Sequence, residues 1–350
     1  PSTTAPATPA VPRPAPAPEP RFDLIVNGAH TRDVFLSLVA DTPYSMLLHP
    51  EVEGQLSLTL RGVTLREALE SIRDVHGFEF RAGLGRIRSL TSKPVGLNVL
   101  TESSLSKVYR RRMEGYVDAA LAAGVRFFVT ALGNPRWVVE RVHPQGGLVY
   151  HDVVDRRWAD KAVAAGVDGL ICVNSRAGGH AGRLGPEQLL AELQPLGLPL
   201  VCAGGVGDER TFASALALGY DGVQMGTRFI ATPECRAHDD YKNAIVAAGE
   251  DEIVLTERVT GVPLSVINTP YLQRVGTRAG PLARLLLKGR TTKHWVRGWY
   301  SLRSAGALRR GLTRPATSKD VWQAGRSVAG VTAVEPAGEI VRRCAAAMGS

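Results

Sequence analysis

The segment from Pro199 to Glu234 places the strongest constraint on how this chain can fold. It holds two short apolar runs, residues 200–203 and 223–225, which end in Gly-Gly and Gly-Thr and flank an amphipathic stretch. Strand, turn, helix, strand and turn in this order form a βαβ unit, which requires parallel strands. Glycines at both strand ends let backbone N–H groups approach an anion, because no Cβ intervenes. The segment therefore predicts an α/β fold with an anion-binding edge, although glycines that only form tight turns would give the same pattern.

The residues of this segment also resemble a known family. AGGVGDERTFASALALGYDGVQMGTRF, residues 203–229, is similar to the nitronate monooxygenases (formerly 2-nitropropane dioxygenases), and so is almost everything from Gly83 onward. Members of this family are FMN enzymes built on a TIM barrel, in which loops after the last two strands grip the phosphate. The resemblance implies FMN as the cofactor, held by backbone N–H groups of Gly204, Gly205, Gly226 and Thr227.

Counting strands backward from this segment gives an incomplete barrel. We expect parallel strands at residues 95–100, 125–130, 148–152, 168–173, 200–203 and 221–225. A closed barrel of this type needs eight strands. We therefore predict an α/β FMN-type TIM (β/α)8 barrel that lacks its first two βα units, with units three to eight at 83–234 and a helical extension and C-terminal segment at 235–350. The missing units would leave two strand edges open and remove a flavin contact, so we expect weak FMN binding.

His180 is the sharpest candidate for chemistry. It follows the strand at 168–173, and reactive groups of barrels lie at the carboxyl ends of strands. An imidazole that titrates near neutral pH can remove an acidic C–H proton or hold an oxyanion. By resemblance this is the catalytic His of the family, with Gly178 and Gly179 lying against the flavin and Asn98 at its ring edge. The alternatives are a loop histidine without catalytic duty and an asparagine that only caps its strand.

Several positions depart from the pattern of the family. Val173 stands where Gln or Asp is common, and Arg176 stands where Glu is common. Asp152 ends a strand that in one branch of the family ends in Lys, and Arg326 replaces a Gln that helps to cover the cofactor. Arg176 and Arg183 would suit an anionic substrate such as a nitronate, or they are solvated loop charges. The physiological substrate therefore stays open.

The first part of the chain has a different character. Residues 1–20 are an Ala/Pro tract expected to form an extended linker, and residues 21–82 read as a small α+β module. Its expected order is β-α-β-β-α-β, with strands at 44–49 and 78–81, a helix capped at Thr31, and a helix begun by Thr64 and Glu67. This order resembles the secretin and TonB short N-terminal domain, especially that of mannose-sensitive haemagglutinin pilus secretins. The resemblance implies a periplasmic module that binds a protein partner.

Composition excludes several classes. No apolar run approaches the roughly 20 residues of a membrane-spanning helix. The four cysteines have neither metal-ligand nor disulfide-framework spacing, so we predict no metal. The net charge of +9 is concentrated between Glu257 and Asp320, but no nucleic-acid-binding motif accompanies it. We expect a solvated basic face, no nucleic-acid partner, and a cytoplasmic location in keeping with the larger part.

Three functions follow from these features. The first is FMN-dependent oxidation of alkyl nitronates by O₂, in which FMN oxidises the nitronate and the reduced flavin reacts with O₂. The second is an FMN-dependent NAD(P)H reductase of quinones or enoyl thioesters, since related barrels carry out such reactions. The third is a non-catalytic fusion whose working part is the secretin-like module.

Overall fold

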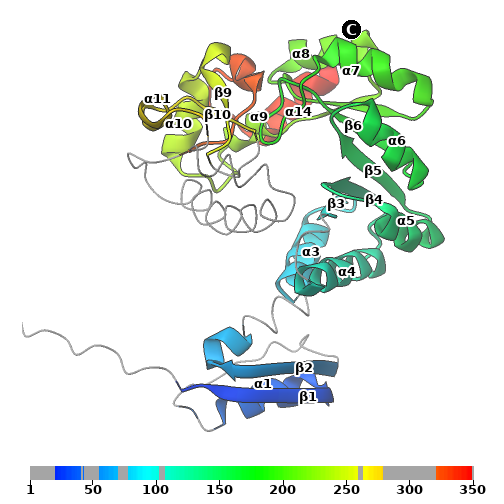
Figure 1. Cartoon of the computed structure of the whole chain (residues 1–350), viewed down its shortest axis with the longest axis vertical. Helices are drawn as coiled ribbons and strands as arrows, with labels where there is room; N and C mark the ends of the chain where they lie inside the picture. Colours follow the sequence, from blue (N-terminus) through cyan, green and yellow to red (C-terminus); the bar gives the residue numbers. More distant parts are fainter. Residues whose placement is uncertain are drawn as a thin grey trace, which may run out of the picture. The chain divides into compact units, whose positions relative to one another are not determined.

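The computed structural model describes residues 20–40, 42, 55–69, 78–101, 107–258, 263–278 and 321–348. The chain divides into two compact units, drawn in Figure 1. The smaller unit comprises Pro1–Ser92 with Glu114–Ala119, and the larger comprises Lys93–Met113 with Ala120–Ser350. Each unit is described by itself.

The smaller unit contains an antiparallel strand pair and a helix. Strand β1 (Phe22–His30) pairs with β2 (Gln55–Val63), and α1 (Thr31–Val39) follows β1 directly. The reciprocal cap predicted for the second helix is confirmed: the Thr64 N–H donates to Glu67 Oε2 at 2.9 Å, and the Glu67 N–H donates to Thr64 Oγ1 at 3.2 Å. The cap predicted at Thr31 is wrong, because His30 is the N-cap and makes no side-chain capping bond. The strand expected over 44–49 lies outside the described residues.

The strand predicted over residues 78–81 is also wrong. These residues begin α3 (Phe78–Leu90), and Phe80 stacks on Tyr116 of α4 (Lys107–Ala122) with ring centroids 4.6 Å apart. The alternation Phe-Glu-Phe is too short to distinguish a strand from a helix. Phe80 and Leu84 are four residues apart and share one helix face, so the longer pattern favours the helix.

The larger unit is built on a six-stranded parallel sheet, which confirms the six predicted strands. The strands lie side by side in chain order: β3 (Gly96–Leu100), β4 (Phe127–Ala131), β5 (Leu148–Val153), β6 (Gly169–Val173), β7 (Leu200–Ala203) and β8 (Gly222–Gln224). The helices between them include α5 (Arg136–Val142), α6 (Arg156–Ala164), α7 (Pro186–Leu193) and α8 (Glu209–Leu218). Right-handed crossovers place such helices on one face of the sheet (Figure 1). The result is the half-barrel of an α/β fold.

The two faces of this sheet differ in burial. One face carries Phe128 and Leu170, whose side chains are completely buried. The alternate residues form the other face, on which Leu100, Phe127 and Leu148 are 39%, 36% and 49% exposed. Among the described residues, β3 and β8 each pair with a single strand. Within the described part of the chain, the half-barrel therefore has two edge strands with a single partner each and apolar side chains exposed on one face.

The sequence predicts a helical extension after β8, but the structure also contains two strands in this segment. Helices α9 (Thr227–Ile230) and α10 (Asp239–Ala247) precede an antiparallel pair, β9 (Ile253–Thr256) and β10 (Leu264–Ile267), and α11 (Pro270–Val275) follows. The runs IVLT and LSVI are rich in β-branched residues, which favour strands. The chain ends with a 3-10 turn (Arg326–Gly330) and α14 (Ala337–Ala346). Most of the predicted basic face, residues 279–320, lies outside the described part.

In the described parts of the chain, no helix combines the length and the apolar character that crossing a bilayer would require.

Candidate active site

A cavity of about 1720 Å³ lies at the carboxyl ends of the parallel strands. The loops after β6, β7 and β8 contribute to its wall, together with residues near β10 and the C-terminal segment. Every predicted site residue except Gly205 lines it, and these residues are Asn98, Gly178, Gly179, His180, Gly204, Gly226 and Thr227. Asn98 lies in the middle of β3, not at its end, and is exposed. The fold thus brings together residues that are up to 129 positions apart in the sequence, since Asn98 and Thr227 border one cavity.

Asn174 joins the loop after β6 to the loop after β7. It is completely buried, its Oδ1 accepts the Arg176 N–H at 2.8 Å, and its Nδ2 donates to the Gly204 carbonyl at 3.0 Å. One amide group thereby fixes two loops that carry candidate binding residues. The sequence reasoning missed Asn174. The available signal was a polar residue placed directly after a buried strand, where side chains are commonly functional.

The loop that carries His180 is held from two sides. The Ser265 N–H of β10 donates to the Gly179 carbonyl at 2.7 Å. On the other side Gly178 packs against Gly325, so closely that a Cβ on Gly178 would lie 2.9 Å from the Gly325 nitrogen. The Gly325 N–H in turn donates to Thr227 Oγ1 at 3.1 Å. His180 itself is exposed and lines the cavity.

The two glycine turns differ in what they offer an anion. Gly226 has open space where a Cβ would stand, and neither its N–H nor that of Thr227 donates to an acceptor in the described part of the chain. Gly205 is buried, and a Cβ there would lie 2.6 Å from Nε of Arg176. Gly204 and Gly205 have φ of +121° and +82°, which only glycine adopts readily. The turn after β8 is therefore the more accessible one.

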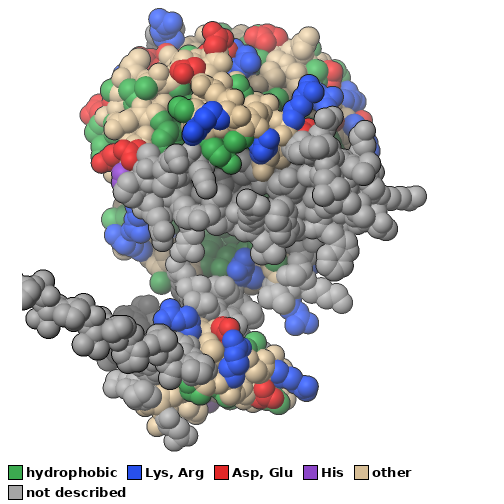
Figure 2. Space-filling view, turned by 60° about the vertical axis from the view of Figure 1, so that its left-hand side comes forward, with side chains coloured by type: hydrophobic (Ala, Val, Ile, Leu, Met, Phe, Trp, Pro, Cys, Tyr) green, Lys and Arg blue, Asp and Glu red, His purple; other side chains and the backbone are tan. Residues whose placement is uncertain are grey.

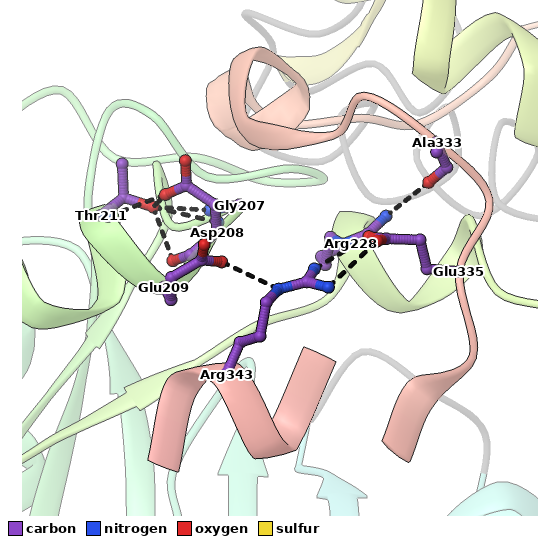
Figure 3. Close-up of polar contacts among 8 residues, drawn as sticks. All are labelled: Gly207, Asp208, Glu209, Thr211, Arg228, Ala333, Glu335 and Arg343. Atoms are coloured by element: carbon purple, nitrogen blue, oxygen red, sulfur yellow. Dashed lines mark hydrogen bonds and ion pairs between the residues drawn. The ribbon is translucent and has the colours of Figure 1, made fainter. Parts of the chain in front are cut away.

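The first turn of α8 already has a carboxylate at its N-terminus. Asp208 Oδ1 accepts the Thr211 N–H at 2.8 Å, and the Thr211 hydroxyl oxygen accepts the Gly207 N–H at 3.1 Å (Figure 3). The N–H groups of Gly207 and Thr211 at the start of α8 are thus engaged within the helix's own first turn. Uncommitted N–H groups at Gly226 and Thr227, with a hydroxyl proton left on Thr227, still fit a phosphate.

A buried arginine ties the turn after β8 to the end of the chain. Arg228 is only 1% exposed, donates to the Ala333 carbonyl at 3.0 Å and pairs with Glu335 (Figure 3). Arg343 of α14 reaches Glu335 at 2.9 Å and Glu209 of α8 at 3.2 Å. The hydrogen bond from Arg343 holds the pKa of Glu335 below its usual range, so Glu335 stays ionised between the two guanidinium groups. This network fixes the C-terminal segment against α8 and α9.

The two arginines that depart from the family pattern lie together outside the cavity wall. Arg176 Nη2 is 2.8 Å from Glu250 Oε2, and Arg326 Nη1 is 3.6 Å from Glu250 Oε1. The Arg326 N–H also donates to the Arg176 carbonyl at 2.9 Å. Arg176 is therefore engaged in an ion pair, whereas Arg183 lines the cavity. Of the two charges considered for an anionic substrate, Arg183 has the suitable position.

Burial shifts the pKa values of two neighbouring residues at the end of β5 in opposite directions. His151 is buried, its Nδ1 is 2.8 Å from Thr130 Oγ1, and burial lowers its pKa to about 4, so the ring is neutral. Burial raises the pKa of Asp152 to about 7. In the part of the chain that the structure covers, no cluster of His, Cys, Asp and Glu is arranged to hold a metal ion.

Comparisons with known proteins agree with this architecture. A profile described as nitronate monooxygenase matches residues 77–346. A Mycobacterium tuberculosis protein named (3aS,4S,5R,7aS)-5-hydroxy-7a-methyl-1-oxo-octahydro-1H-indene-4-carboxyl-CoA dehydrogenase is 30% identical over 251 residues, covering 70% of this chain and 67% of that protein. A probable nitronate monooxygenase of Staphylococcus saprophyticus is 27% identical, covering 50% of this chain and 53% of that protein.

Among solved structures, FabK from Thermotoga maritima superposes with a TM-score of 0.63 at 25% sequence identity. The superposition covers 77% of this chain and 80% of FabK.

Proposed function

Because this chain belongs to the nitronate monooxygenase family, we propose that it oxidises alkyl nitronates with O₂ and uses FMN as the bound electron acceptor. In its broad class it is a flavin oxidoreductase, and its relatives are named monooxygenases and dehydrogenases. The observation that carries the proposal is the convergence of His180 and of glycine turns from three successive strands on one cavity.

The phosphate of FMN would be held by the turn after β8. The backbone N–H groups of Gly226 and Thr227 have no competing acceptor in the described part, and the Thr227 hydroxyl keeps a proton to donate. Gly204 and Gly205 would add a backbone contribution from the turn after β7. Gly178 and Gly179 would let the ring system approach the loop, and Asn98 would hydrogen-bond to its edge. When bound, FMN supplies a two-electron acceptor whose reduced form reacts with O₂.

His180 would act on the substrate in one of two protonation states. A neutral imidazole removes the acidic C–H proton of a nitroalkane, which yields the nitronate. A protonated imidazole holds the negatively charged oxygen atoms of a nitronate already formed. Arg183, which shares the loop and lines the cavity, adds positive charge for such an anion.

The test is oxygen consumption with propane-2-nitronate by the full chain supplied with excess FMN. We expect FMN-dependent turnover, and a loss of at least about 100-fold in His180→Gln when the nitroalkane is the substrate, which is the usual size of a general-base contribution. No oxygen uptake above that of free FMN would refute the proposal. The predicted weak binding is tested separately, since a protein that keeps one FMN per chain after desalting would contradict it.

A second candidate function is oxidoreduction of a thioester. The relative that is 30% identical is named a carboxyl-CoA dehydrogenase, and the cavity exceeds the roughly 300–1,000 Å³ of ordinary ligand pockets. This second candidate function includes the NAD(P)H-dependent reduction of enoyl thioesters or quinones, expected as an alternative from the sequence. Oxidation of NAD(P)H without nitronate, stimulated by an enoyl thioester, would favour it.

A protein-binding role for the N-terminal module and a cytoplasmic location both stay predictions. The described part of the module contains β1, α1 and β2. Binding to pilus components by a chain that takes up no flavin would favour the non-catalytic alternative.

A further inference from the structure

Asp152 occupies a distinctive place in the cavity. It stands near the carboxyl end of β5 and shares a sheet face with Tyr150, whereas His151 between them points to the opposite, buried face. Its side chain lines the same cavity as His180 and Asn98. This is the position in a parallel barrel from which side chains meet substrates.

The two carboxyl oxygen atoms of Asp152 have different surroundings. Oδ1 is sealed from solvent and receives no hydrogen bond from any residue that the structure describes. Oδ2 is not sealed in this way, and the side chain as a whole is only partly buried. A buried carboxylate oxygen without a donor is costly, because the ionised group loses hydration at that atom and gains nothing in return.

Among the residues that the structure describes, no ion pair of Asp152 compensates for this desolvation. The titratable and charged groups around the cavity are His151, Asp155, His180, Arg183, Glu192, Tyr241, Glu257 and Arg278. In the described part of the chain none of them forms a hydrogen bond or an ion pair with Asp152, and burial is the cause of its raised pKa. The surroundings of Asp152 thus favour the neutral carboxylic acid. In that form Oδ1 is the carbonyl oxygen, which loses less on burial than a charged oxygen, and the O–H group at Oδ2 can donate a hydrogen bond into the cavity.

We propose that Asp152 determines substrate specificity as a hydrogen-bond donor: its neutral carboxyl group donates the Oδ2 proton to an oxygen atom of the substrate, and the ionised group repels an anionic substrate. That the natural ligand is a nitronate rests on the proposed function. The role of Asp152 as a hydrogen-bond donor applies to any anion with a planar pair of oxygen atoms. In one branch of the family this strand ends in Lys, whereas in this chain it ends in Asp152.

The sign of the pH dependence follows from proton linkage. Anion binding requires protonated Asp152, so affinity is constant below the pKa of the carboxyl group and falls tenfold per pH unit above it. With a pKa of about 7, affinity should fall about 20-fold between pH 7.5 and 9. The variant His180→Gln, whose side chain does not ionise, separates the effect of Asp152 from any contribution of the imidazole.

The test measures isobutyrate binding by calorimetry on the full chain in the presence of FMN. Isobutyrate is a non-oxidisable carboxylate with the same heavy-atom connectivity as propane-2-nitronate and the same planar pair of oxygen atoms. We expect the 20-fold loss of affinity in the wild type and in His180→Gln, and no loss in Asp152→Asn, whose amide donates a hydrogen bond but cannot ionise. A flat wild-type profile, or a loss that persists in Asp152→Asn, would overturn the proposal.

Infrared spectroscopy supplies a readout that needs neither turnover nor flavin. A protonated-carboxyl band should be present at pH 6, vanish by pH 9, and be missing from Asp152→Asn at both values. A wild type without that band would overturn the proposal even if the variant folded poorly. Nitronate turnover is scored on the same samples: absent turnover with an Asp152-dependent profile refutes only the proposed function, and turnover with a flat profile refutes only the role of Asp152.

Discussion

Replacing Asn174 with Ala should weaken the larger unit and its cofactor site together. The substitution leaves the Arg176 N–H and the Gly204 carbonyl without the partners they have at 2.8 Å and 3.0 Å. Each buried polar group left unsatisfied costs about 1–3 kcal/mol. Because both bonds are only partly buried, we expect a total loss of about 2–4 kcal/mol, which is a large share of the roughly 5–15 kcal/mol that stabilises a typical domain.

Two assays separate the consequences for stability and for binding. No tryptophan falls within the residue ranges of the smaller unit, and Trp137, Trp158 and Trp322 lie in the described part of the larger one, so urea unfolding followed by tryptophan fluorescence reports on the larger unit. Quenching of flavin fluorescence reports FMN affinity, which should fall at least about tenfold, because the loops after β6 and β7 are no longer joined.

Asp168→Ala provides the matched control. Asp168 Oδ2 accepts the Val149 N–H at 2.7 Å and so also joins two strands, but it does so just before β6, at the amino end of the sheet. This variant should lose stability and keep its FMN affinity at equal fraction folded. Unchanged stability in Asn174→Ala, or equal losses of FMN affinity in both variants, would refute the reasoning.

The remaining predictions concern the site and its support. Gly226→Ala should leave unfolding unchanged, because the Cβ enters open space, yet weaken FMN binding in the same quenching assay. Gly178→Ala should lower stability by about 1–3 kcal/mol, because its Cβ meets the Gly325 backbone, and equal stability of the two alanine variants would contradict this packing. Arg228→Met should cost about 1–3 kcal/mol in urea unfolding by leaving the Ala333 carbonyl unpaired, and no loss would show that the network does not stabilise the unit. The neutral His151 has a folded pKa of about 4, below the unfolded value of about 6.5, so its own contribution to stability should fall by up to about 1.4 kcal/mol per pH unit as the pH is lowered from 6.5 to 4. Asp152, whose pKa is raised to about 7, contributes in the opposite direction over the same range, so the prediction is tested in the Asp152→Asn variant. Adding His151→Asn to that variant should flatten the dependence of the unfolding free energy on pH, and an unchanged dependence would exclude His151 as its source.

The parallel sheet was predictable because its signals are local. Most strands of the half-barrel contain a short apolar run bounded by glycine or polar residues, as at LVCA before Gly204. The glycine turns were predictable for the same reason, since a left-handed backbone at Gly204 and Gly205 restricts the residue type at those positions. The reciprocal cap of Thr64 and Glu67 likewise depends on residues three positions apart.

Predictions failed where distant residues decide the outcome. Residues 78–81 alternate like a strand but form a helix, in which Phe80 stacks on Tyr116. The segment after β8 was expected to be helical, yet Ile253–Thr256 and Leu264–Ile267 pair as strands, because each supplies the partner for the other. A residue's local preference competes with contacts that the sequence does not display.

By itself the sequence determined the order of the strands, the glycine turns that close them, and the histidine carried by the loop after β6. Tertiary structure alone decided that Asn174 joins two loops, that Gly325 lies against Gly178, and that one oxygen of Asp152 is sealed without a partner. The physical reason is that strand periodicity and turn geometry depend on neighbours in the chain, whereas desolvation and hydrogen-bond partnership depend on which distant segments exclude water from a given atom.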